Sequence, residues 1–193
     1  MNDTLNLLIG LAMGLNLLAL GTSRLPVLIR TVAVQGVLLG LLPLVLEAHA
    51  LDWRLVLITL ATVAGKGFLI PYMLTRAMRA ANIARELEPF IGYIPSLLLG
   101  AGGTIAAVAL TRYLPLLPEH TGNLHVPGAM ALILTGFILL IGRTKAISQV
   151  CGYLILENGI YLAGLLLVRS TPILVKFGIL LDDRRHFRHR HHR

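Results

Sequence analysis

The stretch ISQVCGYLILENGIYLAGLLLV, residues 147–168, is long and apolar enough to cross a lipid bilayer as one helix. A helix needs roughly 20 such residues to cross a hydrocarbon core of about 30 Å. Its one strongly acidic side chain, Glu157, falls near the middle. A charged residue at that depth costs about 2.5 to 3.5 kcal/mol on insertion scales, so it is rare and marks function. Glu157 is therefore the first candidate site residue.

The chain as a whole is also apolar. Hydrophobic residues make up 56% of its 193 residues and the mean hydropathy is +0.79, which exceeds what a soluble domain of this size buries. Ten-residue blocks of alternating apolar and polar residues, typical of outer-membrane barrels, are absent. The sequence predicts an all-α, polytopic transmembrane bundle with six spanning helices, near 4–22, 27–46, 55–75, 91–111, 126–142 and 146–168.

The chain ends in a segment of different composition. The apolar stretch 171–181 spans only about 16 Å as a helix, so we expect a truncated seventh helix. The tail DDRRHFRHRHHR (182–193) follows it. Read one base out of phase, its CGN and CAY codons would encode apolar or small residues, so we hypothesise a frameshift near Asp182 or Asp183. Two alternatives stay open: a cytoplasmic tail that binds anionic lipids, or a weak metal site at His186, His189, His191 and His192.

These segments divide the chain into four regions: a four-helix membrane region (1–112), an external loop (113–127), a second membrane region (128–181) and the basic tail (182–193). His120 and His125 lie in the external loop, and two histidines without a third ligand favour solvated loop residues over a metal site. The single cysteine cannot form an internal disulfide, and no Cys/His spacing fits an iron–sulfur, haem or zinc site. We expect no cofactor and no metal in this chain.

Basic residues set the expected orientation. They concentrate between helices one and two, three and four, and five and six: Arg24, Arg30, Arg76, Arg79, Arg85, Arg143 and Lys145. The opposite connections hold only Arg54, Arg112 and Arg169. Because arginine and lysine collect on the cytoplasmic side, the N-terminus is predicted to lie outside. The net charge of +8 follows from these residues and the tail, so it indicates no nucleic-acid partner.

Three polar residues, Gln35, Lys66 and Glu157, fall near the midpoints of their predicted helices. At about 1.5 Å per residue they would share one depth in the membrane. Polar groups at that depth indicate a hydrated proton or cation route. The alternative is that Lys66 and Glu157 form a static ion pair, or that each pairs with a neighbouring subunit. The sequence contains no nucleophile with a base and no phosphate-binding loop, so we do not expect an enzyme on its own.

The surroundings of these residues resemble a known family. AISQVCGYLILENGIYLAGLLL (146–167) closely resembles the signature of hydrogenase-4 component E. Further matches are LGTSRLPVLIRTVAVQGVLLGLL (20–42) and GKGFLIPYMLTRAMR (65–79). The resemblance covers nearly all of residues 4–182, and its second half is similar to the small three-helix membrane subunit of respiratory complex I. The family continues into a seventh apolar helix, and this chain departs from it there.

The resemblance implies a non-catalytic membrane subunit of a complex-I-like group 4 hydrogenase, of the hydrogenase-4 or formate hydrogenlyase type. Such a subunit lies in the cytoplasmic membrane of a bacterium or archaeon beside antiporter-like membrane subunits. The nickel–iron and iron–sulfur centres would lie in separate peripheral subunits. Glu157 and Lys66 would then conduct protons or couple them electrostatically. A stand-alone cation or proton transporter and a structural membrane scaffold are the alternatives, although no inverted repeat is evident.

Overall fold

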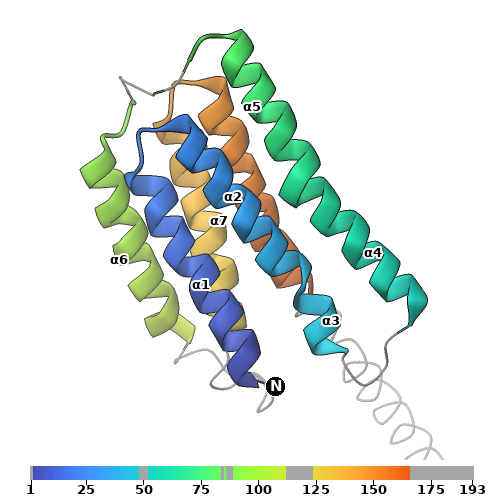
Figure 1. The fold of residues 1–193 in the computed structure, drawn as a ribbon. Helices are drawn as coiled ribbons and strands as arrows, with labels where there is room; N and C mark the ends of the chain where they lie inside the picture. Colours follow the sequence, from blue (N-terminus) through green and yellow to red (C-terminus); the bar gives the residue numbers. More distant parts are fainter. Residues whose placement is uncertain (1, 48–51, 84, 86–88, 112–123, 166–193) are drawn as a thin grey trace, which may run out of the picture.

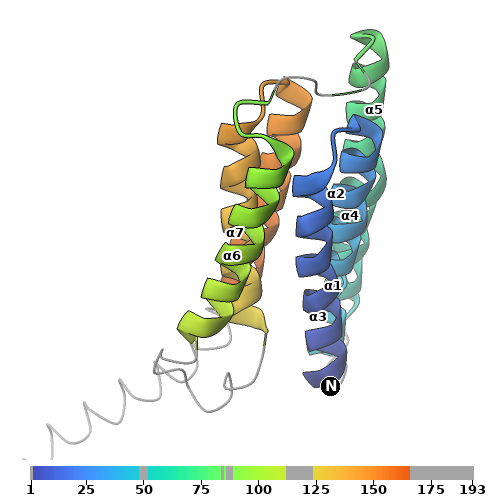
Figure 2. The same cartoon turned by 90° about the vertical axis from the view of Figure 1, so that its left-hand side faces the viewer.

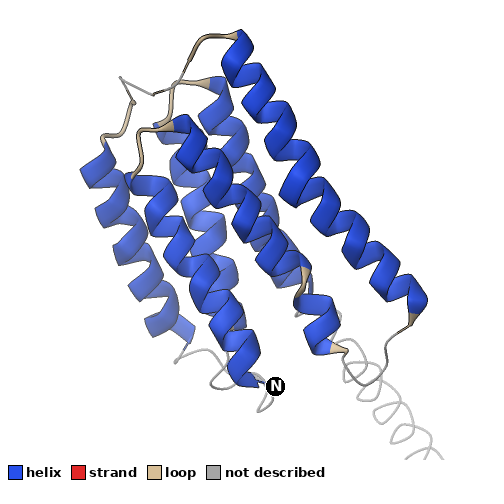
Figure 3. Ribbon diagram, in the orientation of Figure 1, coloured by secondary structure: helices blue, strands red, loops and turns tan. Residues whose placement is uncertain are grey.

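The computed structural model describes residues 2–47, 52–83, 85, 89–111 and 124–165, most of which are helical (Figure 1, Figure 3). The elements are α1 (Asn2–Gly21), α2 (Leu25–Gly40), α3 (Leu42–Leu46), α4 (Trp53–Ala64), η1 (Gly65–Leu69), α5 (Ile70–Ala80), α6 (Tyr93–Thr111), α7 (His125–Gly142) and a helix over 146–165. Within these ranges no residue belongs to a β-strand beyond one isolated bridge between Arg24 and Arg85. The all-α prediction is confirmed.

Five stretches are long and apolar enough to cross a membrane, namely Asp3–Gly21, Leu25–Leu46, Trp53–Ala80, Tyr93–Thr111 and His125–Gly142. They coincide with five of the predicted spans, and they are compatible with an integral membrane protein. The predicted sixth span is helical over 146–165, and its last residues lie outside the described part of the chain. So do the segment 171–181 and the tail. The count of six spans and a truncated seventh therefore stays a prediction.

The third span contains a π-helical turn, η1, at the position of Lys66. The Ile70 amide donates to the carbonyl of Gly65, five residues back, in place of the usual four. Pro71, the next residue, has no amide hydrogen and its ring crowds the preceding turn. The π turn accommodates this proline while keeping α4 and α5 in one continuous rod. Single π turns inside α-helices are frequent at functional sites.

The helices form two layers (Figure 1, Figure 2). α1, α2 and the α4–η1–α5 rod lie in one layer, and α6, α7 and the 146–165 helix lie in the other. α1 packs on α2 within its own layer and on α6 and α7 in the other, while α2 packs on α4, η1 and α5. Buried aliphatic side chains fill the space between the layers, among them Leu5, Ile9, Leu20, Ile29, Leu132 and Ile155. α1 is thus the central helix, and the rod lies at the edge.

One buried arginine joins three elements at the end of the bundle where the α1–α2 loop lies. Arg143 follows α7 and is only 1% exposed. Its Nη2 donates to the Leu20 carbonyl at 2.6 Å and its Nη1 to the Ile91 carbonyl at 3.4 Å, while its guanidinium lies 4.3 Å from the Tyr93 ring centroid. Leu20 is in the last turn of α1, where the helix carries partial negative charge. Arg143, expected only as a loop charge, is therefore also a structural link.

The expectation that His125 is a solvated loop residue is wrong. α7 begins at His125, inside the predicted loop 113–127, and this side chain is only 6% exposed. The Leu124 amide donates to Asn6 Oδ1 at 2.9 Å, which holds the start of α7 against the start of α1. His120 lies outside the described residues. In the ranges that the structure describes, no three His, Cys, Asp or Glu side chains gather as a metal site would require.

α7 and the 146–165 helix approach closely at three glycines, Gly136, Gly152 and Gly159. A Cβ on Gly136 would lie 2.6 Å from the backbone nitrogen of Leu156, and one on Gly152 would lie 2.9 Å from that of Leu140. Cβ atoms in proteins essentially never lie within 3.0 Å of such a neighbour, so only glycine fits here and the two backbones are in direct contact. Small residues permit this kind of packing between membrane helices, where dispersion contacts replace the hydrophobic effect.

We expect Gly159→Ala to lower the free energy of unfolding by about 1–3 kcal/mol, because its Cβ would lie 2.8 Å from the backbone nitrogen of Ile133. Gly164→Ala, in the same helix, is the matched control, since its Cβ would meet no heavy atom within 4 Å. Unfolding of the purified proteins in detergent with increasing dodecyl sulfate measures both. Equal midpoints for the two variants would contradict the close approach.

Candidate functional site

The structure brings Lys66 and Glu157 together. Lys66 Nζ lies 3.1 Å from Glu157 Oε1, which joins η1 to the 146–165 helix by an ion pair. The Lys66 side chain is 18% exposed and that of Glu157 is 43% exposed. The lysine therefore points into the bundle, while the carboxylate lies at its surface. This arrangement is compatible with both predicted roles, a proton route and a static pair.

The same helix surrounds the lysine with further acceptors. Lys66 Nζ donates to Asn158 Oδ1 at 3.0 Å, and it lies 5.5 Å from the ring centroid of Tyr161. Residues 157 and 161 are one helical turn apart and thus face the same side. A carboxylate, an amide oxygen and an aromatic face together stabilise the ammonium, which is costly to leave unpaired in an apolar bundle.

A row of amide side chains continues from the ion pair into the bundle. Asn158 Nδ2 donates to Gln35 Oε1 at 3.4 Å. Gln35 Nε2 donates to Asn16 Oδ1 at 2.8 Å and to the Ala12 carbonyl at 3.0 Å. Asn16, Gln35 and Asn158 are at most 2% exposed. The row links the 146–165 helix, α2 and α1 at the level of the lysine.

The direction of these hydrogen bonds is fixed at both ends. The Lys66 ammonium only donates, so Asn158 must turn its oxygen toward it. The Ala12 carbonyl only accepts, so Gln35 must turn its nitrogen toward it. Every amide therefore donates away from the lysine, and the row ends at Asn16 Nδ2, which is buried and has no partner among the described residues. Because amides do not ionise, these side chains can position the lysine without changing their own charge.

Two glycines let the lysine reach this row. A Cβ on Gly36, directly after Gln35, would lie 2.9 Å from the Cβ of Lys66. A Cβ on Gly67, directly after Lys66, would collide with the Val37 side chain. The backbones of α2 and η1 therefore cross at close range, as small residues allow between membrane helices.

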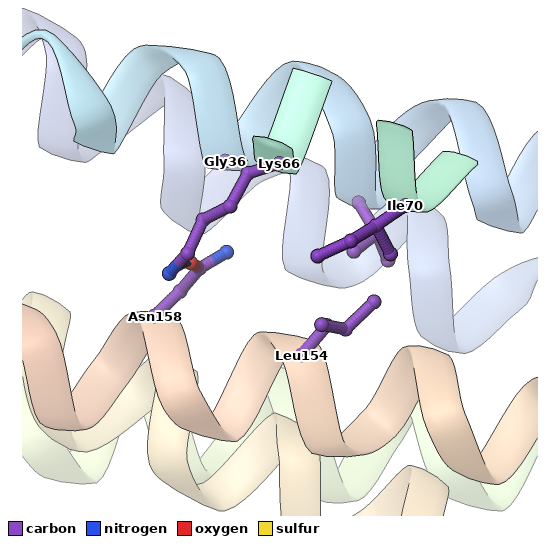
Figure 4. A pocket seen from close by; sticks show the side chains of 6 residues that line it. Gly36, Lys66, Ile70, Leu154 and Asn158 are labelled. Atoms are coloured by element: carbon purple, nitrogen blue, oxygen red, sulfur yellow. Dashed lines mark hydrogen bonds between the residues drawn. The ribbon is translucent and has the colours of Figure 1, made fainter. Parts of the chain in front are cut away.

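A small cavity lies beside the lysine (Figure 4). Its lining residues are Val32, Gly36, Lys66, Ile70, Leu154 and Asn158. Figure 4 shows the Lys66 side chain extending across the space between two helices to Asn158, with Ile70 and Leu154 facing each other further along. The space open to the centre of a water molecule is about 10 Å³, close to what one water needs. The accessible wall of this cavity is almost entirely apolar, so it offers a water few polar partners.

The three residues predicted from the sequence, Gln35, Lys66 and Glu157, belong to one connected set of contacts. Asn16 and Asn158 were not predicted from the sequence, where Gln35 was the one amide among the candidate intramembrane residues. The signal was present: Asn158 directly follows Glu157, and Asn16 is a polar residue well inside an apolar helix. Whether the set conducts protons stays a prediction.

The fixed direction of the amide row makes Asn158→Asp destabilising, although it adds an acid beside Lys66. A carboxylate oxygen would face Gln35 Oε1, and Gln35 cannot turn because its nitrogen bonds the Ala12 carbonyl. We expect the free energy of unfolding to fall by about 1–3 kcal/mol. Asn82→Asp, in an exposed turn, is the matched control. Equal dodecyl sulfate midpoints for both variants would show that the amides reorient freely.

Comparison with known proteins identifies an uncharacterized relative. No family model matches the sequence, and no solved structure matches it. The uncharacterized protein Rv0085 of Mycobacterium tuberculosis is 35% identical over 157 residues, which cover 80% of this chain and 71% of that protein.

Proposed function

The chain belongs to the same family as Rv0085 of Mycobacterium tuberculosis, and we propose that it is a non-catalytic membrane subunit of a complex-I-like group 4 hydrogenase. The proposal extends the resemblance to hydrogenase-4 component E in the segments 20–42, 65–79 and 146–167. On this proposal the chain is no enzyme alone and holds no cofactor. The nickel–iron and iron–sulfur centres belong to other subunits of the complex, and antiporter-like membrane subunits are its neighbours.

The observation that carries the proposal is the ion pair between Lys66 and Glu157. Ionisable residues within membrane spans mark ion or proton pathways. Glu157 is the exposed member of the pair, so a proton would arrive at its carboxylate from a neighbouring subunit. The lysine behind it responds electrostatically to the charge on that carboxylate, and the amide row holds the ammonium in place. The chain thus couples protonation at its surface to its own interior.

A structural scaffold is the second candidate, and the amide row favours it. Three of the five connected side chains cannot ionise, and their hydrogen bonds join three helices. An ion pair with such support would serve to fix helix positions. A stand-alone transporter has less support, because the cavity beside Lys66 has room for about one water and no larger substrate.

Glu157→Gln separates the relay from the scaffold. We expect proton uptake by inverted membrane vesicles, driven by the hydrogenase reaction, to fall at least about tenfold, because an amide cannot gain and release a proton. Blue native electrophoresis should show the complex intact. Glu47→Gln, at the exposed end of the second span, is the control and should pump normally. Loss of the assembled complex would favour the scaffold, and no change in either measurement would exclude both roles for Glu157.

The proposed location is the cytoplasmic membrane of a bacterium or archaeon, with the N-terminus outside. The natural cysteine, Cys151, is completely buried, so introduced cysteines can be labelled selectively. We expect a membrane-impermeant maleimide to label Asp52→Cys in intact cells, and Asn82→Cys only after permeabilisation. Both positions are exposed, and they lie at opposite ends of the rod formed by α4, η1 and α5. The reverse labelling pattern would place the N-terminus inside.

A further inference from the structure

A groove of about 630 Å³ lies between α2 and α5, on the side of Lys66 toward the α1–α2 loop. Its inner wall, by which we mean the partly buried residues Ala33, Gly67 and Pro71, is small or apolar; Ile29, Tyr72 and Thr75 also line the groove. The absence of bulky side chains at Ala33 and Gly67 leaves room for a narrow apolar chain along the helices. The groove is separate from the cavity beside Lys66, which opens toward the 146–165 helix.

The rim of this groove is strongly basic. Arg30 of α2 and Arg76 and Arg79 of α5 line it, and all three are exposed. None of them makes an ion pair with another described residue. No acidic side chain is among the groove's lining residues. Among the residues that the structure describes, the groove therefore presents three guanidinium groups with no carboxylate paired to them.

The depth of these arginines matches the headgroup region of a bilayer. Arg76 and Arg79 follow Lys66 by ten and thirteen residues, or about 15 and 20 Å along the rod. Half of a hydrocarbon core is about 15 Å, so with Lys66 at the midplane both arginines reach the headgroups. Arg30 is five residues from Gln35, about 8 Å, and lies deeper. Its guanidinium must extend along the groove toward the headgroups to meet an anion or water.

We propose that the groove binds one anionic phospholipid. The phosphate lies among Arg30, Arg76 and Arg79, which donate charge-assisted hydrogen bonds to its oxygens. One acyl chain lies along the inner wall past Ala33 toward Gly67. Basic pockets between membrane helices bind anionic headgroups in this way. The lipid completes the face of the bundle between α2 and the rod that carries Lys66. The inference depends on the membrane location and is independent of the hydrogenase assignment.

Native mass spectrometry of the full chain in detergent tests this site. The protein is titrated with phosphatidylglycerol or with phosphatidylcholine of the same acyl chains. We expect a tight first phosphatidylglycerol, preferred at least about tenfold, and loss of that preference in the triple variant R30Q/R76Q/R79Q. Arg54→Gln, an exposed arginine at the other end of the rod, is the control and should keep it. All variants retain the basic tail 182–193, so lipid binding to the tail cancels in the comparison.

One further variant and one competition experiment distinguish a bound phospholipid from a bound anion. Ala33→Phe fills the inner wall and keeps the arginines, so it should weaken the first phosphatidylglycerol if an acyl chain lies there. Soluble glycerol phosphate should fail to displace the lipid at equal concentration. An unchanged preference in the triple variant would overturn the proposal. Displacement by glycerol phosphate, or no effect of Ala33→Phe, would overturn it in favour of a simple anion site. Unfolding midpoints in dodecyl sulfate confirm that each variant is folded.

Discussion

The ammonium of Lys66 is the constraint on which the centre of this bundle depends. An unpaired cation is costly in apolar surroundings, and this one is surrounded by a carboxylate, an amide oxygen and a tyrosine ring. Because the ammonium only donates hydrogen bonds, it also fixes the orientation of the amides of Asn158, Gln35 and Asn16. Each of these amides turns its oxygen toward the preceding donor. The Ala12 carbonyl at the far end requires the same direction. The ammonium at one end and the α1 carbonyl at the other thus require the same orientation of the amides. The resulting hydrogen bonds join helices that are far apart in the sequence.

Backbone geometry makes that arrangement reachable. The π turn at Lys66 accommodates Pro71 within a continuous rod, and Gly36 and Gly67 let η1 lie directly against α2. On the opposite side, glycines of α7 and of the 146–165 helix bring those two helices into contact. In a lipid environment such close contacts provide the packing energy that the hydrophobic effect supplies in water. The small residues therefore determine where the polar side chains meet.

The Glu157 carboxylate is exposed whereas the amide row is buried, and this difference bears on the proposed function. On the proposed function, a proton would reach Glu157 from the surface of the bundle, where its carboxylate is partly exposed. On the same proposal, the site would respond to a neighbouring subunit, whereas a channel closed within this chain would require more ionisable groups. The basic groove lies on the other side of the same rod, so a lipid there would contact the element that carries Lys66. The rod, which has little buried surface of its own, is the element most dependent on what surrounds it.

The sequence alone determined the all-helical class, the positions of five spans and the polar residues Gln35, Lys66 and Glu157, because these follow from hydropathy and from the cost of a charge in a membrane. It did not determine that Asn16 and Asn158 complete the set, or that Arg143 and His125 are buried. Hydropathy gives the depth of a residue along its helix, whereas the rotation of the helix decides which neighbour it meets. That rotation is set by packing at glycines and at the π turn, through contacts between segments far apart in the chain. Only the tertiary structure could therefore turn three residues at one depth into one connected site.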